Sequence, residues 1–384
     1  MKTVISFVSA FLPKEMNHVY RQVSNLHSYN SHVLTRSVQN LNIFPLKNLK
    51  LLNKSNLRIF FRLYYRMRQQ VVPLSRYEIN QALSYCESIN RPVLHVYQGD
   101  VALRSLNLLS EYEGPKVVSF HGADLSESRL TSKYSKLWNK VDIVLCRCEA
   151  FVHKLAELGC PTSKIKLNYT GIPMPENVKK PTTFSFNSDK IKNLKIIQVC
   201  RFLEKKGLET TIHAFKKLLQ TGLDARLDLI GDGPLKQSLI NLVTELGISD
   251  KVSFKGFLTG TDLLNSFLDA DIFSHPSCMS AEGDREGIPN SLLEAMSYGL
   301  PVVSSLHSGI PEVIKHRENG LLVESHDIDS LTSLFVEVIS NPYSSIKMAQ
   351  KARETINSSF CISVCINELE KAYDLACELK RSRS

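Results

Sequence analysis

The chain alternates short apolar runs with stretches of helical pattern, at a steady spacing along its length. In the first half, apolar runs predict strands at residues 3–9, 31–37, 93–99, 116–122, 142–148 and 164–170. In the second half, similar runs predict strands at residues 194–200, 226–231, 251–256, 271–277, 301–305 and 320–324. The hydrophobicity is continuous rather than alternating, which is typical of parallel strands covered on both faces. Together with the helical stretches, the runs predict doubly wound α/β domains.

Residues 175–193, "PENVKKPTTFSFNSDKIKN", interrupt this rhythm with Pro, Lys, Ser and Asn, as an interdomain linker does. We therefore expect two tandem Rossmann-like domains, over residues 1–178 and 194–363, joined by a linker at 179–193. A basic-ended amphipathic helix over residues 364–384 is expected to join the first domain. Since ligands of such sheets bind beyond the carboxyl ends of the strands, two facing domains imply a cleft between them.

The composition supports this size of protein and excludes several other classes. The chain has 384 residues, of which 43% are hydrophobic, enough to bury a sizeable core. Its nine cysteines are scattered, and the one close pair, Cys146 and Cys148, has neither zinc-site nor redox-motif spacing. We expect free thiols in a reducing cytosol, with this pair on one face of a strand. No apolar stretch approaches the roughly 20 residues of a membrane span, and we interpret "MKTVISFVSAFLP" as a first strand rather than a signal peptide.

The net charge of +9 is concentrated in the first domain, because residues 16–77 contain no Asp or Glu but ten Lys or Arg. Within this window, Arg58, Arg62 and Arg66 recur along one helical face, followed by Arg68 and surrounded by aromatic residues. A basic, aromatic helix suits an anionic membrane surface. A solvated helix that packs its apolar side on its own domain is the alternative. No nucleic-acid motif accompanies the charge, so we expect no nucleic-acid partner.

Candidate chemistry follows the strand predicted at residues 194–200. Arg201 comes directly after this strand, and Lys206 and Gly207 open the next helical stretch. Fixed cations beside a helix N-terminus form a good seat for a diphosphate. Two ordinary surface cations are the alternative. The later glycines Gly231 and Gly233 lack the third glycine of a dinucleotide fingerprint, so an NAD site is poorly supported.

A second group of polar residues follows the strand predicted at residues 271–277. In "SAEGDREGIPNSLLEAMSYG", Pro289 is expected at the first helical position, which leaves free backbone N–H groups at residues 288–291. Glu286 precedes this helix and is placed to accept hydrogen bonds from polyol hydroxyls. Glu294 lies about one turn inside it, where it suits a ribose; a capping or salt-bridging role is the alternative. Two carboxylates beside an anion-binding helix end suit a ligand that is part sugar and part phosphate.

At these residues the chain resembles glycosyltransferase family 4, the retaining transferases of GT-B fold. Glu286-x7-Glu294 matches the EX7E motif of this family, and "VCRFLEKKGLETTIHAF" resembles its GRLxxKKGL segment, with Cys200 where glycine is usual. "LIGDGPLKQSL", "VSFKGFL", "GLPVVSSLHSGIPEVI" and "ENGLLVESHD" also match, so the resemblance is nearly continuous over residues 194–327. "SFHGADLS" resembles the HG-containing loop of the first domain. The motif "SSLHSGIPEVI" is most similar to those of transferases of bacterial exopolysaccharide and lipopolysaccharide synthesis.

The resemblance implies a role for each matching residue. Arg201 and Lys206 would bind the donor diphosphate and stabilise the charge on the departing nucleotide. Glu294 would bind the ribose, whereas Glu286 and His121 would hold the donor sugar. The remaining donor-binding residues implied are Gly231, Gly233, Phe257, Gly287, Ile288, Pro289, Asn290 and Ser291. Such enzymes retain the anomeric configuration without an agreed protein nucleophile, so Glu286 is not assigned as one.

The same resemblance implies that neither a metal nor another cofactor is needed, because protein cations take the metal's place. The stretch "FLPKEMNHV" departs from the family pattern, since it lacks the usual Gly-Gly loop after the first strand. Lys14 and Glu15 are the candidates for contacts there.

We therefore expect a cytoplasmic enzyme, peripheral on the inner face of the plasma membrane, whose first domain faces the acceptor and the membrane. It would transfer a hexose from a nucleotide-diphosphate sugar to a lipid-linked or oligosaccharide acceptor in surface polysaccharide biosynthesis. A GT-B epimerase or phosphorylase is one alternative, since both would use a diphosphate seat. A non-catalytic, membrane-associated subunit of the same fold is another. The intact Glu286, Glu294, Arg201 and Lys206 argue against that second alternative.

Overall fold

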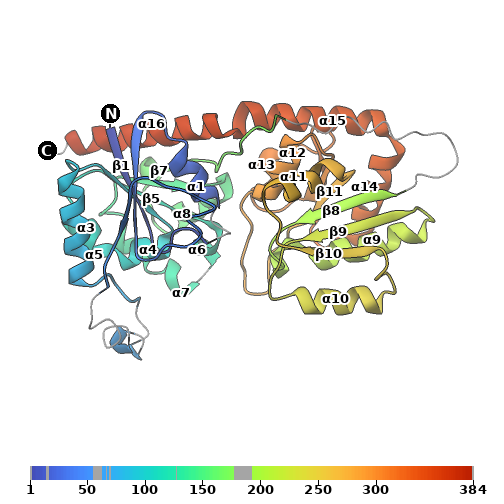
Figure 1. Ribbon diagram of the computed structural model, residues 1–384, viewed down its shortest axis with the longest axis horizontal. Helices are drawn as coiled ribbons and strands as arrows, with labels where there is room; N and C mark the ends of the chain where they lie inside the picture. Colours follow the sequence, from blue (N-terminus) through green and yellow to red (C-terminus); the bar gives the residue numbers. More distant parts are fainter. Residues whose placement is uncertain are drawn as a thin grey trace. The chain divides into compact units, whose positions relative to one another are not determined.

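The computed structural model describes residues 2–13, 17–54, 63–65, 67–68, 71–126, 128–176 and 193–382. The chain divides into two compact units: Met1–Gly171 with Ile362–Ser384 (unit 1), and Ile172–Cys361 (unit 2). In the described residues each unit contains one parallel sheet flanked by helices, which confirms the predicted fold class of two doubly wound α/β domains (Figure 1). Of the predicted linker, only Asn193 lies within the described residues.

The sheet of unit 1 has seven strands in the described residues, in the order β3-β2-β1-β4-β5-β6-β7. Its strands are β1 (Lys2–Val8), β2 (Tyr29–Thr35), β3 (Leu49–Leu51), β4 (Val93–Tyr97), β5 (Lys116–Ser119), β6 (Ile143–Cys146) and β7 (Ile165–Leu167). The pattern predicts all of these except β3, a three-residue edge strand with half-buried or exposed side chains. A strand this short and this exposed carries no continuous apolar run to mark it.

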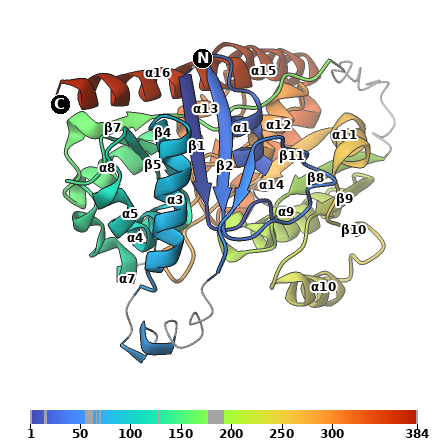
Figure 2. The ribbon, with the colours of Figure 1, turned by 60° about the vertical axis from the view of Figure 1, so that its left-hand side comes forward.

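Helices cover the sheet of unit 1, and the last helix of the chain is one of them. The helices are α1 (Asn17–Ser24), α3 (Arg76–Ser88), α4 (Gly99–Arg104), α5 (Leu106–Glu111), α6 (Gly122–Ser126), α7 (Ser128–Thr131), α8 (Glu149–Glu157) and α16 (Ile362–Arg381). Helix α16 lies beside strand β1 and helix α1, so the two ends of the chain meet in this unit (Figures 1 and 2). Its apolar side packs on a sheet face made by Val4, Val93, Val117, Ile143 and Leu145.

Buried polar contacts fix α16 on unit 1. The carboxylate of Glu370 accepts hydrogen bonds from the backbone N–H groups of His27 (2.7 Å) and Ser28 (2.8 Å). Tyr373 shares a hydrogen bond of 2.7 Å between its hydroxyl and Nδ1 of His95, in the middle of the covered sheet face. Since buried polar groups require partners, these bonds specify where the helix docks.

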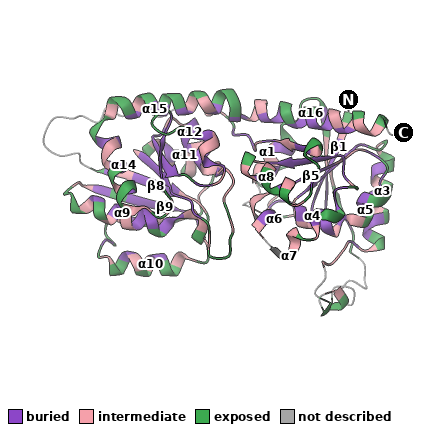
Figure 3. Cartoon of the chain, turned by 180° about the vertical axis from the view of Figure 1, so that it is seen from behind, coloured by how far each residue is buried: buried purple, intermediate pink, exposed green. Residues whose placement is uncertain are grey.

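The sheet of unit 2 has six strands in the described residues, in the order β10-β9-β8-β11-β12-β13. All six match predicted runs: β8 (Leu194–Val199), β9 (Ala225–Ile230), β10 (Val252–Gly256), β11 (Ile272–His275), β12 (Val302–Ser305) and β13 (Leu321–Val323). The helices are α9 (Leu208–Gln220), α10 (Lys236–Glu245), α11 (Gly260–Asp269), α12 (Asn290–Ser297), α13 (Ile310–Val313), α14 (Ile328–Ser340) and α15 (Pro342–Thr355). Helices α9, α10 and α14 pack on one sheet face. The central strands are buried, whereas the outer sides of the helices are exposed (Figure 3).

The strand order fixes where each unit can bind a ligand. In unit 1, β1 pairs with both β2 and β4, and in unit 2, β8 pairs with both β9 and β11. The connections leave each central strand in opposite directions, so the loops beyond the carboxyl ends of β1/β4 and of β8/β11 diverge. In open α/β sheets this switch point is where ligands bind.

Two remaining expectations concern cysteines and membrane spans. All nine cysteines are free thiols. Cys146 ends strand β6, but Cys148 is the N-cap of helix α8. The prediction that both side chains lie on one face of a strand was therefore wrong. Among the described residues, no helix combines the length and the apolar character needed to cross a bilayer.

The docking of α16 gives a direct test of what stabilises unit 1. We expect Glu370→Ala to lower the free energy of unfolding by about 1 to 3 kcal/mol, because two partly buried N–H groups lose their charged acceptor. Glu368→Ala on the same helix is the matched control. Glu368 is half exposed, and its ion-pair partner among the described residues is the exposed Lys371, so a change within about 0.5 kcal/mol is expected. Urea unfolding followed by fluorescence of Trp138, the chain's one tryptophan and buried in unit 1, measures both. Equal effects of the two substitutions would contradict the assignment.

Candidate functional site

The loop that follows strand β8 presses tightly against the segment that follows β11. Arg201 lies exposed after the strand, and a 3-10 turn, Glu204–Lys206, leads to Gly207, the N-cap of α9. Gly207 has φ of 64°, and a Cβ added to it would lie 1.9 Å from the carbonyl oxygen of Pro276. Only glycine tolerates both the left-handed backbone and this approach. Helix α9 thus begins at Leu208, just after the two residues at which the sequence placed its start.

Lys206 and Glu286, assigned by resemblance to the diphosphate and to the donor sugar, form an ion pair with each other. Both side chains are largely buried, with exposed fractions of 13% and 14%. Burial alone would raise the pKa of Glu286, but the charges of Lys206 and Lys205 and the hydrogen bond from Lys206 lower that pKa to about 2. Glu286 is therefore ionised at neutral pH and acts as a hydrogen-bond acceptor rather than as an acid.

Each residue of the turn Glu204–Lys206 contacts the loop that precedes α12. Glu204 accepts the N–H of Ala281 at 3.0 Å, Lys205 pairs with Asp284 at 2.7 Å, and Lys206 pairs with Glu286. These contacts dock residues 281–286 on the turn. Sequence reasoning missed Lys205 and Asp284. The sequence indicates this contact only through the opposite net charges of the segments "EKK" and "EGDRE".

Histidine His275 ends strand β11 next to this ion pair. Its ring is fully buried and stacks on Phe273 with centroids 5.9 Å apart, and neither ring nitrogen has a hydrogen-bond partner among the residues that the structure describes. Burial lowers its pKa to about 3, the charge of Lys206 adds to this effect, and Glu286 opposes it. A neutral imidazole whose donor nitrogen and acceptor nitrogen are both unused is unusual in a protein interior and marks this strand end as a functional candidate. The local signal for this residue is modest: a histidine at the carboxyl end of an apolar strand.

Helix α12 begins one residue later than expected, so the placement of Pro289 was wrong. Pro289 is the N-cap, and Asn290 and Ser291 form the first helical positions. The N–H groups of Leu292 and Leu293 both bond to the Pro289 carbonyl. Since proline has no N–H, the backbone donors at the start of α12 are those of Ile288, Asn290 and Ser291.

Three other residues of this region, all predicted to bind the nucleotide-sugar donor, are half-buried. Gly287 and Ile288 lie between Glu286 and the N-cap, and Glu294 is the fifth residue of α12. The backbone N–H of Glu286 also donates to Nε2 of His307 at 3.4 Å. Burial lowers the pKa of His307, which keeps this acceptor neutral.

The glycines Gly231 and Gly233 have a packing role that the sequence did not show. A Cβ at Gly231 would lie 1.8 Å from the carbonyl oxygen of Cys200, and one at Gly233 would lie 2.6 Å from that of Phe202. Their absence of side chains lets the loops after β8 and β9 cross beyond the strand ends. Phe257, after β10, is 47% exposed.

The predicted His121 lies in unit 1, beyond strand β5, and its partner there is an arginine that sequence reasoning missed. Arg147 donates from Nη2 to Nε2 of His121 at 3.0 Å and from Nη1 to the hydroxyl of Thr170 at 2.5 Å. The His121 N–H bonds to Asp124 at 2.8 Å, which fixes the loop. Burial, together with the charge of Arg147, holds the pKa of His121 well below its usual range.

Several predicted residues lie outside the described residues. These are Lys14, Glu15, Arg58, Arg62 and Arg66. Arg68 is described; it is exposed and lies over the ring of Tyr64, 4.5 Å from its centroid. Within the described part of the chain, no group of three or more His, Cys, Asp or Glu is arranged to hold a metal.

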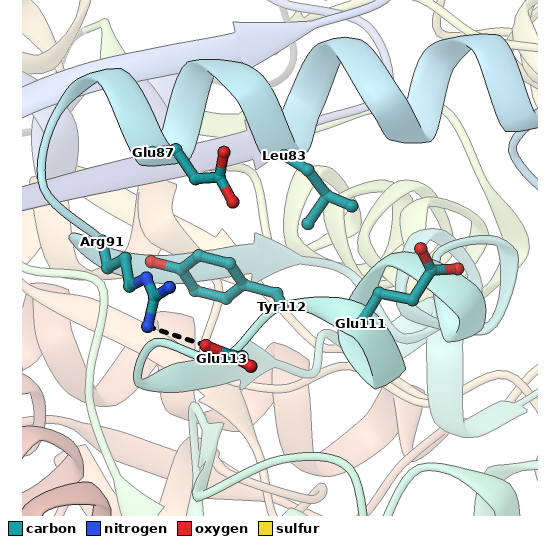
Figure 4. A pocket seen from close by; sticks show the side chains of 6 residues that line it. All are labelled: Leu83, Glu87, Arg91, Glu111, Tyr112 and Glu113. Atoms are coloured by element: carbon teal, nitrogen blue, oxygen red, sulfur yellow. Dashed lines mark ion pairs between the residues drawn. The ribbon is translucent and has the colours of Figure 1, made fainter.

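A cavity of about 160 Å³ in unit 1 lies away from these residues. It is lined by Leu83, Glu87, Arg91, Glu111, Tyr112 and Glu113, with Arg91 paired to Glu113 (Figure 4). Residues 91 and 113 precede β4 and β5, so the cavity lies at the amino-terminal edge of the sheet. That edge is opposite the one where doubly wound sheets bind ligands.

Comparison with known proteins agrees with this geometry. A family model described as "Glycosyl transferases group 1" matches residues 180–355. WcaL of Escherichia coli (strain K12), whose name assigns it to colanic acid biosynthesis, is 33% identical over 288 residues, 72% of this chain and 68% of that protein. The amylovoran biosynthesis glycosyltransferase AmsK of Erwinia amylovora is 34% identical over 279 residues, 71% of this chain and 67% of that protein.

Solved structures share the fold at low sequence identity. Anabaena Alr3699/HepE in complex with UDP and glucose has a TM-score of 0.78 and 14% identity, covering 97% of this chain and 100% of that one. The lipopolysaccharide outer core galactosyltransferase WaaB has a TM-score of 0.71 and 16% identity, covering 97% of this chain and 99% of that one. The sequence matches go further than the fold and confirm the resemblance: this chain is a glycosyltransferase and belongs to the glycosyl transferases group 1 family.

Proposed function

We propose that the enzyme transfers a hexose from a nucleotide-diphosphate sugar to a lipid-linked or glycan acceptor in surface polysaccharide biosynthesis, with retention of anomeric configuration. The observation that carries this proposal is the convergence of Arg201, the Lys206–Glu286 pair and the start of α12 at the carboxyl ends of β8 and β11. The names of WcaL and AmsK, and the UDP and UDP-glucose bound to HepE, support it.

The charges of this site suit a diphosphate. Lys205 and Lys206 are balanced by Asp284 and Glu286, whereas Arg201 is exposed and forms no ion pair with the residues that the structure describes. Its guanidinium and the first N–H groups of α12 are therefore the donors available to an incoming diphosphate. As the sugar bond breaks, they would stabilise the negative charge that grows on the departing nucleotide.

Glu286 would bind the donor sugar. With a pKa lowered to about 2, it offers carboxylate oxygens to sugar hydroxyls at neutral pH. Lys206, which holds this carboxylate, is placed to exchange part of that contact for a phosphate oxygen. Glu294, inside the helix, would bind the nucleotide ribose. No metal or other cofactor is assigned a role in this proposal.

We further propose that unit 1 associates with the inner, anionic face of a membrane. The described residues next to the basic window expose large apolar side chains: Leu63 is 56% exposed, Tyr64 49% and Met67 77%. Together with Arg68 they offer the mixture of apolar and cationic groups that binds an anionic lipid surface.

Arg201→Ala tests the donor site. We expect it to weaken nucleotide-sugar binding about 10- to 100-fold, because a charge-assisted contact to phosphate is lost. Binding is measured by thermal stabilisation with a panel of UDP and GDP sugars, since a ligand of the native state raises the melting temperature. Arg226→Ala, an exposed arginine in strand β9 of the same unit, is the matched control and should bind normally. Undiminished stabilisation of Arg201→Ala would remove the basis of the proposal.

The Lys206–Glu286 pair predicts a separation of stability from activity. We expect Lys206→Met to destabilise unit 2 by about 3 to 5 kcal/mol, because Glu286 is left as a buried, unpaired charge. The double variant Lys206→Met with Glu286→Gln should recover most of this stability and remain inactive. Lys217→Met, which breaks the exposed pair with Asp329, should change stability by less than about 1 kcal/mol. Differential scanning calorimetry and a transfer assay measure the two properties.

The same pair predicts an acid dependence. Since the pKa of Glu286 is lowered from 4.5 to about 2, its ionised form stabilises the folded state fully above pH 4.5. This contribution should be lost as the pH falls from about 4.5 to about 2. The stability difference between wild type and Glu286→Gln is therefore expected to shrink across that window, and a difference independent of pH would contradict the depressed pKa.

Membrane association is measured by co-sedimentation with vesicles. We expect binding to vesicles that contain phosphatidylglycerol, loss of binding in high salt, and little binding to pure phosphatidylcholine. Replacement of Arg58, Arg62, Arg66 and Arg68 by Gln should weaken binding to the anionic vesicles at least tenfold. Binding that ignores lipid charge would argue against the proposed surface.

A further inference from the structure

We propose that His18, His121, Arg147 and Thr170 of unit 1, together termed the Arg147 site, bind an oxyanion carried by the acceptor, either a phosphate or a carboxylate. That the ligand is an acceptor rests on the proposed function, and the proposal assigns His121 to the acceptor instead of to the donor sugar that the resemblance implies. That it is an anion rests on the chemistry of the site itself.

The Arg147 site lies at the carboxyl-terminal edge of the unit 1 sheet. Arg147 directly follows β6, His121 lies two residues after β5, and Thr170 lies three residues after β7. These strands are neighbours in the order β5-β6-β7, so three consecutive strand ends place their side chains together. His18, from α1, adds a second imidazole, with its ring centroid 5.3 Å from that of His121.

Arg147 is a largely buried cation whose hydrogen-bond partners are neutral. Its two side-chain bonds go to the Thr170 hydroxyl and to a ring nitrogen of His121, and no described carboxylate forms an ion pair with it. Arg36, another arginine of unit 1 with a largely buried side chain, pairs directly with Glu78 at 2.8 Å. A guanidinium stays charged in a protein, so its burial requires a compensating anion.

The nearest candidate for that anion within the fold is already engaged. The charge of Asp124 raises the pKa of Arg147 through space. The carboxylate oxygens of Asp124, however, accept hydrogen bonds from the backbone N–H groups of His121, at 2.8 Å, and Asp100, at 3.4 Å. Burial, moreover, raises the pKa of Asp124 to about 6, which weakens it as a counter-charge near neutral pH. The positive charge of Arg147 therefore remains largely available to a ligand.

The tautomer of His121 completes the site. Because a guanidinium only donates, Nε2 of His121 is the acceptor of the 3.0 Å bond, and the ring proton of the neutral imidazole lies on Nδ1. Nδ1–H and the remaining guanidinium N–H groups are all donors. A neutral sugar hydroxyl would accept hydrogen bonds from some of these donors but would leave the charge of Arg147 uncompensated. A phosphate or a carboxylate would accept the hydrogen bonds and also compensate the charge.

The inference is tested on the full-length protein with UDP present at saturation, so that the diphosphate seat of unit 2 is filled. Ligand-observed NMR, which detects weak binding, compares glucose 1-phosphate, methyl glucuronoside and the neutral methyl glucoside. We expect at least one anionic sugar to bind at least tenfold more tightly than methyl glucoside. The stronger of the two identifies phosphate or carboxylate as the acceptor group.

Substitution of Arg147 locates the binding. Arg147→Gln should lower the affinity for the anionic sugar to that of methyl glucoside and leave UDP binding unchanged. Arg104→Gln, which removes a partly exposed arginine of the same unit, should leave the preference intact. Should Arg147→Gln fail to fold, Arg147→Lys keeps the charge but loses the two-pronged geometry, and a three- to tenfold weaker binding of the anion is expected.

Two results would overturn the inference: a wild-type protein with no preference for the anionic sugars, or a preference that survives unchanged in the foldable Arg147 variant. If UDP still binds in the same samples, such a result contradicts the Arg147 site alone. Loss of UDP binding by the wild-type protein would instead contradict the proposed function.

Discussion

The central strands of each sheet are parallel and buried on both faces, and this constraint decides where chemistry can occur. Their side chains lie beneath helices, where a polar group without a hydrogen-bond partner costs free energy. His95 illustrates the rule: it lies inside the unit 1 sheet and bonds to both Tyr373 and Ser119. Polar side chains that do not have to satisfy this requirement lie beyond the strand ends, where loops diverge at the β1/β4 and β8/β11 switch points.

The two units handle buried charge at those strand ends differently. In unit 2, Lys205 and Lys206 each have a carboxylate partner in the loop before α12. The ion pairs lower the free-energy cost of burying charge, and they also hold the loop in place, so the groups proposed to bind a donor are already ordered in the free protein. The exposed Arg201 retains its full charge for an incoming anion.

In unit 1 the balance is reversed. The hydrogen-bond partners of Arg147 are a hydroxyl and an imidazole. Asp124, whose charge acts on Arg147 through space, accepts hydrogen bonds from backbone N–H groups instead. The proposed site of unit 2 thus combines ion pairs with an exposed guanidinium, whereas the Arg147 site of unit 1 contains a largely buried cation that forms no ion pair with a carboxylate of the described residues.

The sequence determined the elements of the fold, and the tertiary structure decided which residues of the site meet. Strands such as β8 are predicted because burial on both faces leaves a continuous apolar run, whereas β3 escapes because its side chains are not deeply buried. Lys206 and Glu286 were both named from motifs, but their pairing joins residues 80 positions apart and has no local pattern. Arg147, His275 and Asp284 were missed for the same reason. The role of a charged group or an imidazole depends on its burial and on its neighbours in space, and both are set by segments that are distant in the sequence.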